Sequence, residues 1–344
     1  MIKTIDIQEF NSLRADYPLL DVRSPSEYAQ GHIPGAVCLP LFDDEERKVV
    51  GTLYKKSGRE AAILEGLDFA GKKLRAFVKQ ARKAIPGKKL LMHCWRGGMR
   101  SESMAWLLNL AGFDVCLLKG GYKAYRRHVL SLWEKPANIL ILSGKTGTGK
   151  TEILKYMQEL GQQVIDLEGI AHHKGSAFGA IGESPQPTSE QFENDLADQW
   201  MLLDPSRPVW LEDESHSIGS VFIPHTLYQQ MNLARVARLD MPKDLRVKRL
   251  IIDYAGFPKE LLLHSVGKIQ KRLGGQNTKA ATEAIERDDF ATAIAIVLDY
   301  YDKAYTYDLG KRKPEQFIHL ETQTELAEEN ARLVLEQIKH LKDE

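Results

Sequence analysis

The stretch Ile139-Leu140-Ile141-Leu142-Ser143-Gly144-Lys145-Thr146-Gly147-Thr148-Gly149-Lys150-Thr151 decides the fold at the middle of the chain. Its apolar half is typical of a buried strand, its second half fits the pattern G-x-x-x-x-G-K-[ST], and helical spacing follows over residues 151–160. Glycines let backbone N–H groups turn toward phosphate oxygens, and the start of a helix adds positive potential. We therefore predict a strand, a phosphate-binding loop and a helix. Lys150 would meet a terminal phosphate, and the Thr151 hydroxyl would hold a metal ion if one is present.

Three acidic residues, Glu212, Asp213 and Glu214, follow a further apolar run at 208–211. The end of such a strand is where a metal-holding carboxylate belongs in phosphate-loop folds. Successive side chains cannot all point the same way, so the pattern leaves open which of the three acts, and a solvated turn is the alternative interpretation. No glutamine or arginine can be assigned to orient a water or to contact a transition state. The sequence therefore predicts phosphate binding without predicting hydrolysis of a nucleoside triphosphate.

A second loop with reactive side chains is His93-Cys94-Trp95-Arg96-Gly97-Gly98-Met99-Arg100-Ser101. It lies between an apolar run at 90–93 and helical spacing at 101–111. A cysteine at the start of a helix is favoured as the thiolate. Backbone N–H groups, Arg96 and Arg100 would form an anion cradle around Cys94, while Gly97 and Gly98 would allow close approach. An inert buried thiol is the alternative interpretation of Cys94.

Apolar runs and helical spacing divide the chain into three regions. Residues 1–132 alternate strands with helices, which indicates a parallel sheet. A polar connector with a proline at 133–138 leads to the phosphate-loop domain, residues 137–242. Residues 243–344 are predicted to be mainly helical and to pack on that domain, so the expected class is α/β with a helical C-terminal region. The predicted strands are 19–22, 90–93, 115–118, 139–143, 163–166 and 208–211, and the predicted C-terminal helices include 280–301 and 325–341.

Composition sets further limits. At 344 residues and 38.9 kDa the chain is long enough for about two domains. Its 47 Lys and Arg balance 47 Asp and Glu, so contact with nucleic acid has to come from a local basic patch. None of the three cysteines forms a CxxC pair, which argues against a zinc site, and Cys38 and Cys116 are expected in the core. No signal segment or membrane helix is found, so a cytoplasmic protein without a membrane partner is expected.

The cysteine loop, with Asp21-Val22-Arg23-Ser24-Pro25-Ser26-Glu27-Tyr28 and Gly31-His32-Ile33-Pro34-Gly35-Ala36, resembles the rhodanese family over about residues 1–130. The resemblance implies that Cys94 carries sulfur or selenium as a persulfide or perselenide, with Asp21 and Arg23 supporting the loop. Five residues separate Cys94 from Arg100, whereas sulfur-transferring rhodaneses usually have four. The longer loop is similar to that of the related dual-specificity phosphatases and implies a wider pocket, but the sequence identifies no general acid for that chemistry.

Joined to the phosphate loop, this pattern resembles the tRNA 2-selenouridine synthase family from about residue 5 to beyond residue 320. The combination is far more specific than either motif alone. Besides the two loops, the segments that carry the resemblance are Lys119-Gly120-Gly121-Tyr122-Lys123, Leu167-Glu168-Gly169, His172-His173-Lys174-Gly175-Ser176, Phe178-Gly179 and Glu212-Asp213-Glu214-Ser215.

That resemblance implies a two-step transferase acting on the wobble uridine, position 34, of tRNA. Geranyl diphosphate first alkylates the sulfur of 5-substituted 2-thiouridine, and selenium from selenophosphate then replaces the S-geranyl group to give 2-selenouridine. We expect the phosphate loop to bind the geranyl donor, and Cys94 with Arg96 and Arg100 to deliver selenium. The implied partners are a tRNA carrying 2-thiouridine and an enzyme that supplies selenophosphate. No tightly bound cofactor is expected, and a requirement for Mg²⁺ is left open.

Binding of tRNA requires a basic surface. Tyr122 and Tyr125 are expected to be available for base stacking, and residues 243–344 are expected to grip the anticodon arm. Solvated helix faces are the alternative interpretation of the charges. The candidate basic residues are Lys119, Lys123, Arg126, Arg127, Lys174, Arg235, Arg238, Arg246 and Arg249.

Two enzyme classes compete with a tRNA-modifying transferase. A P-loop kinase or ATPase with a regulatory rhodanese-like domain would bind adenine nucleotide tightly, although an intact Cys94 with its arginines argues against a merely regulatory domain. A cysteine phosphatase, suggested by the longer loop, would release phosphate from an aryl phosphate. Only the transferase would link selenium to RNA.

Overall fold

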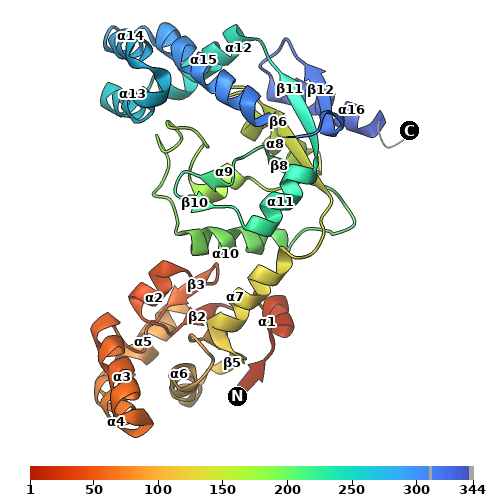
Figure 1. Cartoon of the computed structure of the whole chain (residues 1–344). Coiled ribbons are helices and arrows are strands. Elements are labelled where there is room, and N and C mark those ends of the chain that lie inside the picture. The colour runs from red at the N-terminus through yellow and green to blue at the C-terminus, as the bar shows by residue number, and fades with distance from the viewer. Residues whose placement is uncertain (310–311, 341–344) are drawn as a thin grey trace. The chain divides into compact units, whose positions relative to one another are not determined.

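The computed structural model describes residues 1–309 and 312–340, which Figure 1 colours along the chain. These residues form two compact units. The first contains Met1–Leu132 and Glu193–Asp198, and the second contains Trp133–Phe192 and the described residues from Gln199 onward. Within the described ranges, no helix is both long and apolar enough to span a membrane.

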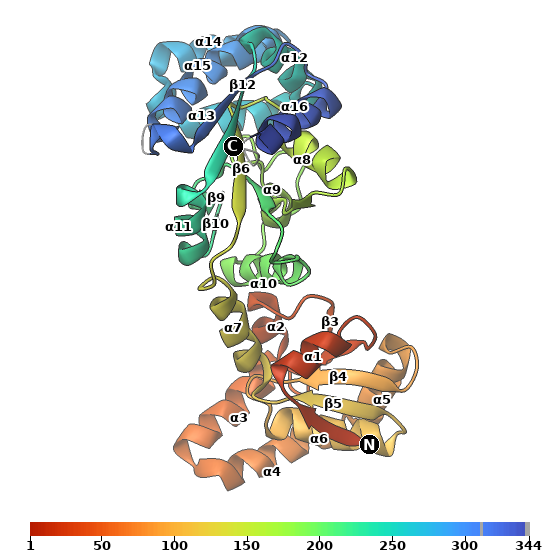
Figure 2. The ribbon, with the colours of Figure 1, turned by 90° about the vertical axis from the view of Figure 1, so that its right-hand side faces the viewer.

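The first unit is built on a five-stranded parallel sheet with the order β1-β5-β4-β2-β3 (Figure 2). The strands are β1 (Ile2–Ile5), β2 (Leu19–Asp21), β3 (Ala36–Cys38), β4 (Lys89–His93) and β5 (Asp114–Leu118). The predictions of β2, β4 and β5 are confirmed. Prediction missed β1 and β3, because each has only one buried residue, whereas all three residues of β2 are buried.

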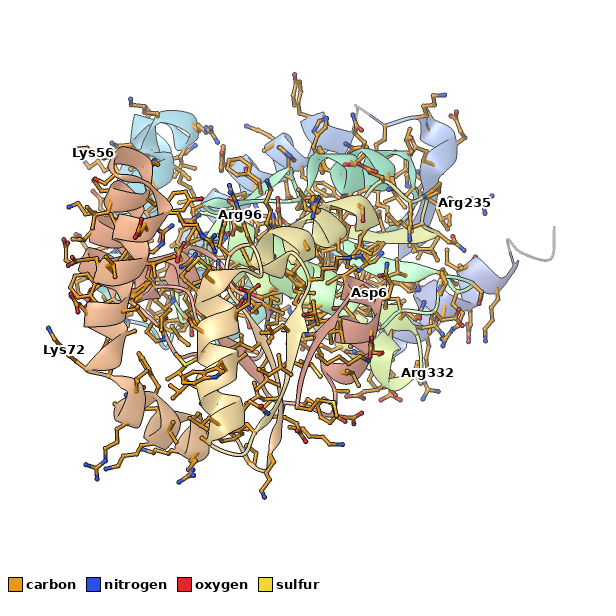
Figure 3. The ribbon with its side chains drawn as sticks, turned by 90° about the horizontal axis from the view of Figure 1, so that it is seen from below. Asp6, Lys56, Lys72, Arg96, Arg235 and Arg332 are labelled. Atoms are coloured by element: carbon orange, nitrogen blue, oxygen red, sulfur yellow. The ribbon has the colours of Figure 1, made fainter. Side chains whose placement is uncertain are left out.

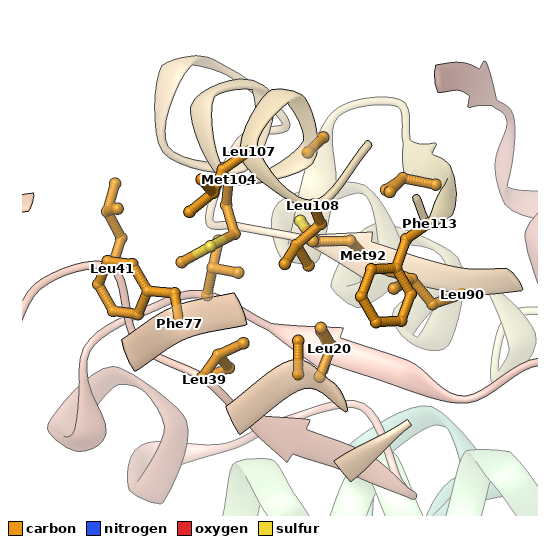
Figure 4. Packing of buried hydrophobic residues seen from close by; sticks show 14 of the residues in the cluster. Leu20, Leu39, Leu41, Phe77, Leu90, Met92, Met104, Leu107, Leu108 and Phe113 are labelled. Atoms are coloured by element: carbon orange, nitrogen blue, oxygen red, sulfur yellow. The ribbon is translucent and has the colours of Figure 1, made fainter. Parts of the chain in front are cut away.

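Helices cover both faces of this sheet. Leu90 and Met92 of β4 point to one face, where they share a core with Phe77, Met104 and Leu108 (Figure 4). Alternate residues of a strand point to opposite faces, and on the second face α7 packs with α1. The helices are α1 (Ile7–Leu13), α2 (Pro25–Gln30), α3 (Asp44–Lys56), α4 (Gly58–Gly71), α5 (Leu74–Ala84), α6 (Met99–Leu110) and α7 (Gly121–Leu132).

Helices α3 and α4 pack against each other and lie between β3 and α5 in the chain. The start of α3 is fixed by a capping box, in which Asp43 accepts a hydrogen bond from the Glu46 N–H at 2.8 Å and Glu46 bonds back to the Asp43 N–H. Lys56 at the end of α3 and Lys72 just after α4 extend away from the pair (Figure 3). The pair therefore adds a charged surface to the first unit.

The second unit has its own five-stranded parallel sheet, with the order β12-β11-β6-β8-β7. Strand β6 is buried along its whole length between β11 and β8 and leads directly into the phosphate loop. Helices α8 and α16 pack on one face, where Met157 and Val334 share a core. The elements are β6 (Ile139–Gly144), α8 (Lys150–Glu159), β7 (Gln163–Val164), β8 (Val209–Glu212), β11 (Arg235–Asp240), β12 (Phe317–Glu321) and α16 (Ala327–His340), with a two-stranded ribbon of β9 (Ser217–Ile218) and β10 (Val221–Phe222).

The C-terminal third differs from the prediction in two ways. The single helix expected at 280–301 is two helices, which separate where Asp288 takes a φ of 62°. The region also supplies a strand, because β12 pairs with β11 at the sheet edge. The helices are α12 (Lys243–Tyr254), α13 (Lys259–Leu273), α14 (Gly275–Glu286) and α15 (Phe290–Leu309), and the connecting helices of the chain are α9 (Leu167–Ala171), α10 (Ser189–Trp200), α11 (His225–Leu233) and η1 (Pro314–Gln316).

One segment of the expected 137–242 domain belongs to the first unit. Residues Glu193–Asp198 of α10 group there. Asn194 donates hydrogen bonds to the His32 carbonyl and to the Tyr122 hydroxyl, both at 2.9 Å. Arg14 adds an ion pair with Asp198 at 2.6 Å. The first unit is therefore completed by residues that are distant in sequence.

Candidate functional site

Cys94 lies buried where β4 ends and the loop before α6 begins. Its sulfur accepts a hydrogen bond from the Ser101 hydroxyl at 3.2 Å and lies 3.9 Å from the Gly98 carbonyl. Burial raises the pKa of this thiol, but the Ser101 hydroxyl, the positive charge of Arg100 and hydrogen bonds with the loop backbone outweigh it, so that the pKa lies below its ordinary value. The loop therefore favours a nucleophilic thiolate, as predicted for a cysteine in this position.

The two predicted arginines have different environments. Arg100 is held by Glu27, to which it donates at 2.5 Å and 3.3 Å. Burial raises the pKa of Glu27, but the bonds to Arg100 and the nearby Arg47 lower it below its usual range, so the pair is charged at neutral pH. Arg96 is exposed. Arg100 thus supplies fixed positive charge near Cys94, while Arg96 is accessible to an incoming anion.

The cysteine loop rests on the glycine pair that follows β5. The Tyr122 N–H donates to the Cys94 carbonyl at 2.9 Å, and the Lys123 N–H donates to the Trp95 carbonyl at 3.0 Å. Gly121 has a φ of 58°, and a Cβ there would lie 2.3 Å from the Cys94 oxygen. The segment Lys119–Lys123, found in the sequence only through a family resemblance, is therefore the support on which the loop is built.

Gly97 and Gly98, expected together to allow close approach to the loop, have different surroundings. A Cβ on Gly97 would lie 2.7 Å from the Leu118 carbonyl, so the packing of the loop requires glycine there. A Cβ on Gly98 would meet no atom within 4 Å, so no protein atom crowds this position. The expectation that an anion can approach the loop closely at Gly98 stays a prediction.

Asp21 and Arg23 form a fully buried ion pair beneath the loop, with 2.6 Å between Arg23 Nη2 and Asp21 Oδ2. Arg23 also donates to the Gly31 carbonyl at 2.7 Å. Burial raises the pKa of Asp21, but His93 and Arg23 lower it below its usual value. Both residues support the fold around the loop and lie out of reach of solvent.

The expected base-stacking role of two tyrosines is wrong. Tyr122 is fully buried, and the Arg23 guanidinium lies 3.7 Å from the centre of its ring. Tyr125 is also fully buried. Both rings belong to the packing between α7 and the sheet, so neither has a free face for a base.

The phosphate loop borders a cavity of about 480 Å³ in the second unit. Gly147 and Gly149 take φ values of 85° and 79°, a conformation that requires glycine. Lys150 donates from Nζ to the Gly144 carbonyl at 3.2 Å and lines the cavity. The loop residues that line it are Gly144, Thr146, Gly147, Gly149, Lys150 and Thr151, while Lys145 and Thr148 hold the loop together through Asp302 and the Lys145 carbonyl.

The structure gives different surroundings to the three acidic residues among which the sequence could not choose. Glu212 is buried and accepts a hydrogen bond from the Leu167 N–H at 2.9 Å, and burial raises its pKa well above the usual value. Asp213 also lines the phosphate cavity and pairs with Arg312 at 2.8 Å. Glu214 lines the cavity beside Glu168, and burial followed by repulsion from Glu168 raises its pKa well above the usual value.

Glu168 is a cavity residue that reasoning from the residues alone missed. Its carboxylate accepts a hydrogen bond from the Thr151 hydroxyl at 3.1 Å. It was visible only as part of a family-like segment, because a lone glutamate after a short strand carries no signal of its own. In the part of the chain that the structure describes, no group of three or more His, Cys, Asp and Glu side chains is arranged to hold a metal ion.

Several residues expected to bind tRNA serve the phosphate loop or internal pairs instead. Arg246 is only 2% exposed, pairs with Asp302 at 2.7 Å and donates to the Thr146 carbonyl at 3.1 Å, so its assignment to an RNA surface is wrong. Arg249 pairs with Glu152 at 2.6 Å and borders the phosphate cavity.

The remaining candidates divide by exposure. Arg126 is partly buried against Glu193 and Asn194, which removes it from the free surface. Lys174 lines the phosphate cavity within 3.4 Å of Glu183. Arg238 is paired with Asp240 at 3.0 Å. The exposed candidates are Lys119, Lys123 and Arg127 in the first unit and Arg235 in the second.

Fold and loops together define a chain that joins a rhodanese-like domain to a P-loop domain. A family profile described as a rhodanese-like domain matches residues 6–128, and one described as the AAA domain of tRNA 2-selenouridine synthase matches residues 137–334. The chain belongs to the tRNA 2-selenouridine synthase family.

Named relatives are similar in sequence to this chain over most of their length. The tRNA 2-selenouridine synthase of Shewanella loihica is 37% identical, with 87% of this chain and 89% of the relative covered. That of Shewanella piezotolerans is 36% identical, with 87% and 91% covered. Among solved structures, an N-terminal domain of a Clostridium difficile 630 protein is 39% identical and covers 37% of this chain and 99% of its own, with a TM-score of 0.34.

Proposed function

We propose that this chain is a tRNA-modifying transferase that converts 5-substituted 2-thiouridine at position 34 to 2-selenouridine through an S-geranyl intermediate. The observation that carries the proposal is the presence, in one chain, of a buried cysteine whose thiol pKa is lowered by Ser101 and Arg100, and of a phosphate loop with its own cavity. Relatives named tRNA 2-selenouridine synthase over nearly the whole length support the substrate. The two loops would then perform separate steps.

In the first step, the phosphate loop holds geranyl diphosphate. The sulfur of thiouridine bonds to C1 of the geranyl chain as the C1–O bond breaks, and the diphosphate leaves with the bonding electrons. The uracil loses its N3 proton to solvent. Loop N–H groups and Lys150 stabilise the charge that develops on the leaving diphosphate.

Mg²⁺ fits the residues around this loop. The Thr151 hydroxyl and the carboxylates of Glu168 and Glu214 are the hard oxygen ligands that Mg²⁺ takes together with phosphate oxygens. Bound there, the ion would neutralise charge on the diphosphate. It would also favour the ionised form of Glu214, whose pKa is raised by burial and by Glu168.

In the second step, selenophosphate binds at Cys94. Its selenium is already at the oxidation level of selenide, so capture as a perselenide would need an oxidant that neither substrate supplies. We therefore infer attack of the Cys94 thiolate on phosphorus: the S–P bond forms, the P–Se bond breaks, and HSe⁻ leaves with the electron pair. Selenide adds to C2 of the uracil and expels geranyl thiol, which takes the selenide proton. Water then hydrolyses the S–P bond to release phosphate.

Two features of the loop support attack on phosphorus. Five residues separate Cys94 from Arg100, which by resemblance to the dual-specificity phosphatases implies a pocket that can take a phosphate group, and no protein atom crowds the loop at Gly98. Arg100 and the start of α6 supply positive charge for its oxygens. This step differs from the perselenide that the rhodanese resemblance implies, and mass spectrometry of the intact protein after brief exposure to selenophosphate distinguishes the two adducts.

Nucleoside mass spectrometry tests the division of roles. A tRNA carrying 2-thiouridine is incubated with geranyl diphosphate and selenophosphate, using wild type, Cys94→Ser and Lys150→Ala. We expect 2-selenouridine with wild type, S-geranyl-2-thiouridine accumulating with Cys94→Ser, and unmodified 2-thiouridine with Lys150→Ala. Cys116→Ser, which removes a partly buried thiol from β5, is the matched control and should resemble wild type. Loss of geranylation in Cys94→Ser with retention in Lys150→Ala contradicts the division.

A further inference from the structure

A second cavity of the second unit has no role in the steps above. It measures about 60 Å³ and lies among helices α12 to α15. Its inner walls are hydrocarbon, with Val266, Ile285, Ala293 and Val297 among the lining residues, and all four are buried. A cavity with such walls offers a ligand dispersion contacts and release from water, but no hydrogen bonds.

This apolar cavity adjoins the phosphate cavity. The residues that line both are Thr146, Ser176, Leu250, Tyr254 and Tyr301. Thr146 is itself part of the phosphate loop, and a Cβ on the neighbouring Gly147 would lie 3.0 Å from Leu250. A single ligand can therefore rest its phosphate groups on the loop and extend an apolar group between α12 and α15.

Polar groups are confined to the shared mouth of the two cavities. The Tyr301 hydroxyl accepts a hydrogen bond from the Ala177 N–H at 2.9 Å, and burial raises the pKa values of Tyr301 and Tyr254, so both rings stay neutral. Beyond this mouth the cavity is walled by carbon. A nucleobase placed there would leave its nitrogen and oxygen atoms without hydrogen-bond partners, which costs binding free energy. An alkyl chain has no polar atoms and would lose no hydrogen bonds.

We propose that the apolar cavity is the binding site for the tail of an isoprenoid diphosphate, with the terminal isoprene unit enclosed by Val266, Ile285, Ala293 and Val297. The inference rests on the proposed function, because it assigns the second part of the same donor. A volume of about 60 Å³ suits a few carbon atoms, which matches the last unit of a two-unit chain better than a longer tail. A one-unit chain on the phosphate loop would end near the mouth and fill the cavity poorly.

The test is isothermal titration of the full chain with geranyl, dimethylallyl and inorganic diphosphates and with ADP. We expect wild type to bind geranyl diphosphate at least tenfold more tightly than the other three ligands. Val297→Phe, which fills the cavity, should weaken geranyl diphosphate about tenfold and leave inorganic diphosphate within twofold. Thr292→Phe adds the same ring at an exposed position of α15 and should change neither affinity.

The possible outcomes separate the tail site from the proposed function. Equal binding of geranyl and inorganic diphosphate by wild type, or a full geranyl preference in Val297→Phe, overturns the tail site while leaving the phosphate loop in place. Tighter binding of ADP than of geranyl diphosphate overturns it in favour of a nucleotide enzyme. No binding of any diphosphate by wild type defeats the proposed donor itself. If Val297→Phe also loses inorganic diphosphate and so fails to fold, Ala293→Val gives the same comparison with a smaller intrusion.

Discussion

Ser101 donates a hydrogen bond to the Cys94 sulfur that works against the effect of burial on that thiol. Hydrogen bonds to a charged group are stronger than neutral ones, so Ser101→Ala should raise the pKa of Cys94 and slow its alkylation. We expect alkylation by iodoacetamide at pH 7 to be roughly tenfold slower, and the midpoint of its pH profile to move upward. Peptide mass spectrometry follows Cys94 separately from Cys38, whose pKa burial raises to about 11.

Ser103→Ala is the control for that experiment. Ser103 lies in the same helix, but its hydroxyl donates only to the carbonyls of Met99 and Arg100. Its removal should leave the reactivity of Cys94 unchanged. An equal slowing in both variants would mean that the start of α6, rather than the bond to sulfur, controls the thiol.

Glu214 gives a second prediction, which concerns the stability of the folded protein and its decrease as pH rises. Its pKa is raised in the folded state by burial and by Glu168, so the stability it contributes is present below the ordinary glutamate pKa and is lost as pH rises. Glu214→Gln removes that loss. We expect its midpoint of thermal unfolding to lie a few degrees above wild type at pH 8 and close to wild type at pH 5.

Differential scanning calorimetry without added metal or diphosphate measures this difference. Glu336→Gln, a substitution at an exposed position of α16, is the control and should leave the midpoint unchanged at both values of pH. The assignment fails if the gain of Glu214→Gln is the same at pH 5 and pH 8.

Sequence reasoning found the residues whose chemistry is encoded locally. Cys94 and Lys150 each sit in a motif whose glycines, charges and flanking elements are contiguous. The bonds that tune these residues join separate segments, such as Arg100 to Glu27, and spacing along the chain carries no signal for them. Arg246 illustrates the opposite error, because a charge in a basic helix looks solvated until a distant aspartate is folded against it.

A Gly121→Ala substitution tests whether the turn between β5 and α7 positions the cysteine loop. Alanine at its φ of 58° would place Cβ 2.3 Å from the Cys94 carbonyl, so the loop has to move. Gly112→Ala is a matched control, since its φ is 93° and no atom lies within 4 Å of the added Cβ. Both variants should lose about 1–2 kcal/mol of unfolding free energy from backbone strain.

Gly121→Ala should lose stability beyond this strain, because its Cβ displaces the loop, and it should no longer support the reaction at Cys94. Gly112→Ala should show neither effect. Urea unfolding and the conversion of S-geranyl-2-thiouridine to 2-selenouridine measure the two effects. Retention of that conversion in Gly121→Ala would show that the glycine pair after β5 is not what positions the loop.

Two ion pairs join α12 to α15, and they should contribute very different amounts to the free energy of unfolding. Arg246 is buried, holds Asp302 and donates to the phosphate loop. Arg246→Met leaves Asp302 only its longer pair with Lys145 at 3.8 Å and should cost about 3 kcal/mol. It should also weaken binding of inorganic diphosphate. Lys243 and Asp299 form an exposed pair between the same helices, so Lys243→Met should cost less than about 1 kcal/mol.

Urea unfolding and titration with inorganic diphosphate measure both ion-pair variants. Similar small losses of stability in the two, with unchanged diphosphate affinity, would mean that the helical region and the phosphate loop are not coupled through Arg246.

The elements that prediction missed share a physical cause. Strands β6 and β8 are buried on both faces and appear as continuous apolar runs, so they are recognisable in the sequence. Strand β12, Phe-Ile-His-Leu-Glu, is an edge strand and mixes apolar with polar residues. Strand β11, Arg-Val-Ala-Arg-Leu-Asp, lies one place in from that edge, but its charged residues are not fully buried and interrupt the apolar run. Their pairing partners, which are far away in sequence, determine that they are strands.

At the scale of the whole molecule, equal numbers of acidic and basic residues mean that affinity for tRNA depends on a local patch. Lys119, Lys123 and Arg127 are exposed, and the Lys123 N–H itself donates to the Trp95 carbonyl of the cysteine loop. Arg127 lies within 3.7 Å of the position that a Cβ on Gly120 would occupy, which keeps its charge near that support. We propose that this basic patch binds RNA phosphates near the Cys94 loop.

Replacing all three residues of this basic patch with alanine should weaken tRNA binding about tenfold and reduce the slope of log affinity against log salt by roughly 2–3. Filter binding over a range of salt concentrations measures both values. The control replaces Arg75, Lys79 and Arg82, exposed residues of α5 on the opposite face of the same sheet, and removes equal charge. Because the total charge of the two variants is the same, an equal loss in both would attribute RNA affinity to net charge, whereas a loss confined to the first shows that tRNA binds at the patch beside the cysteine loop.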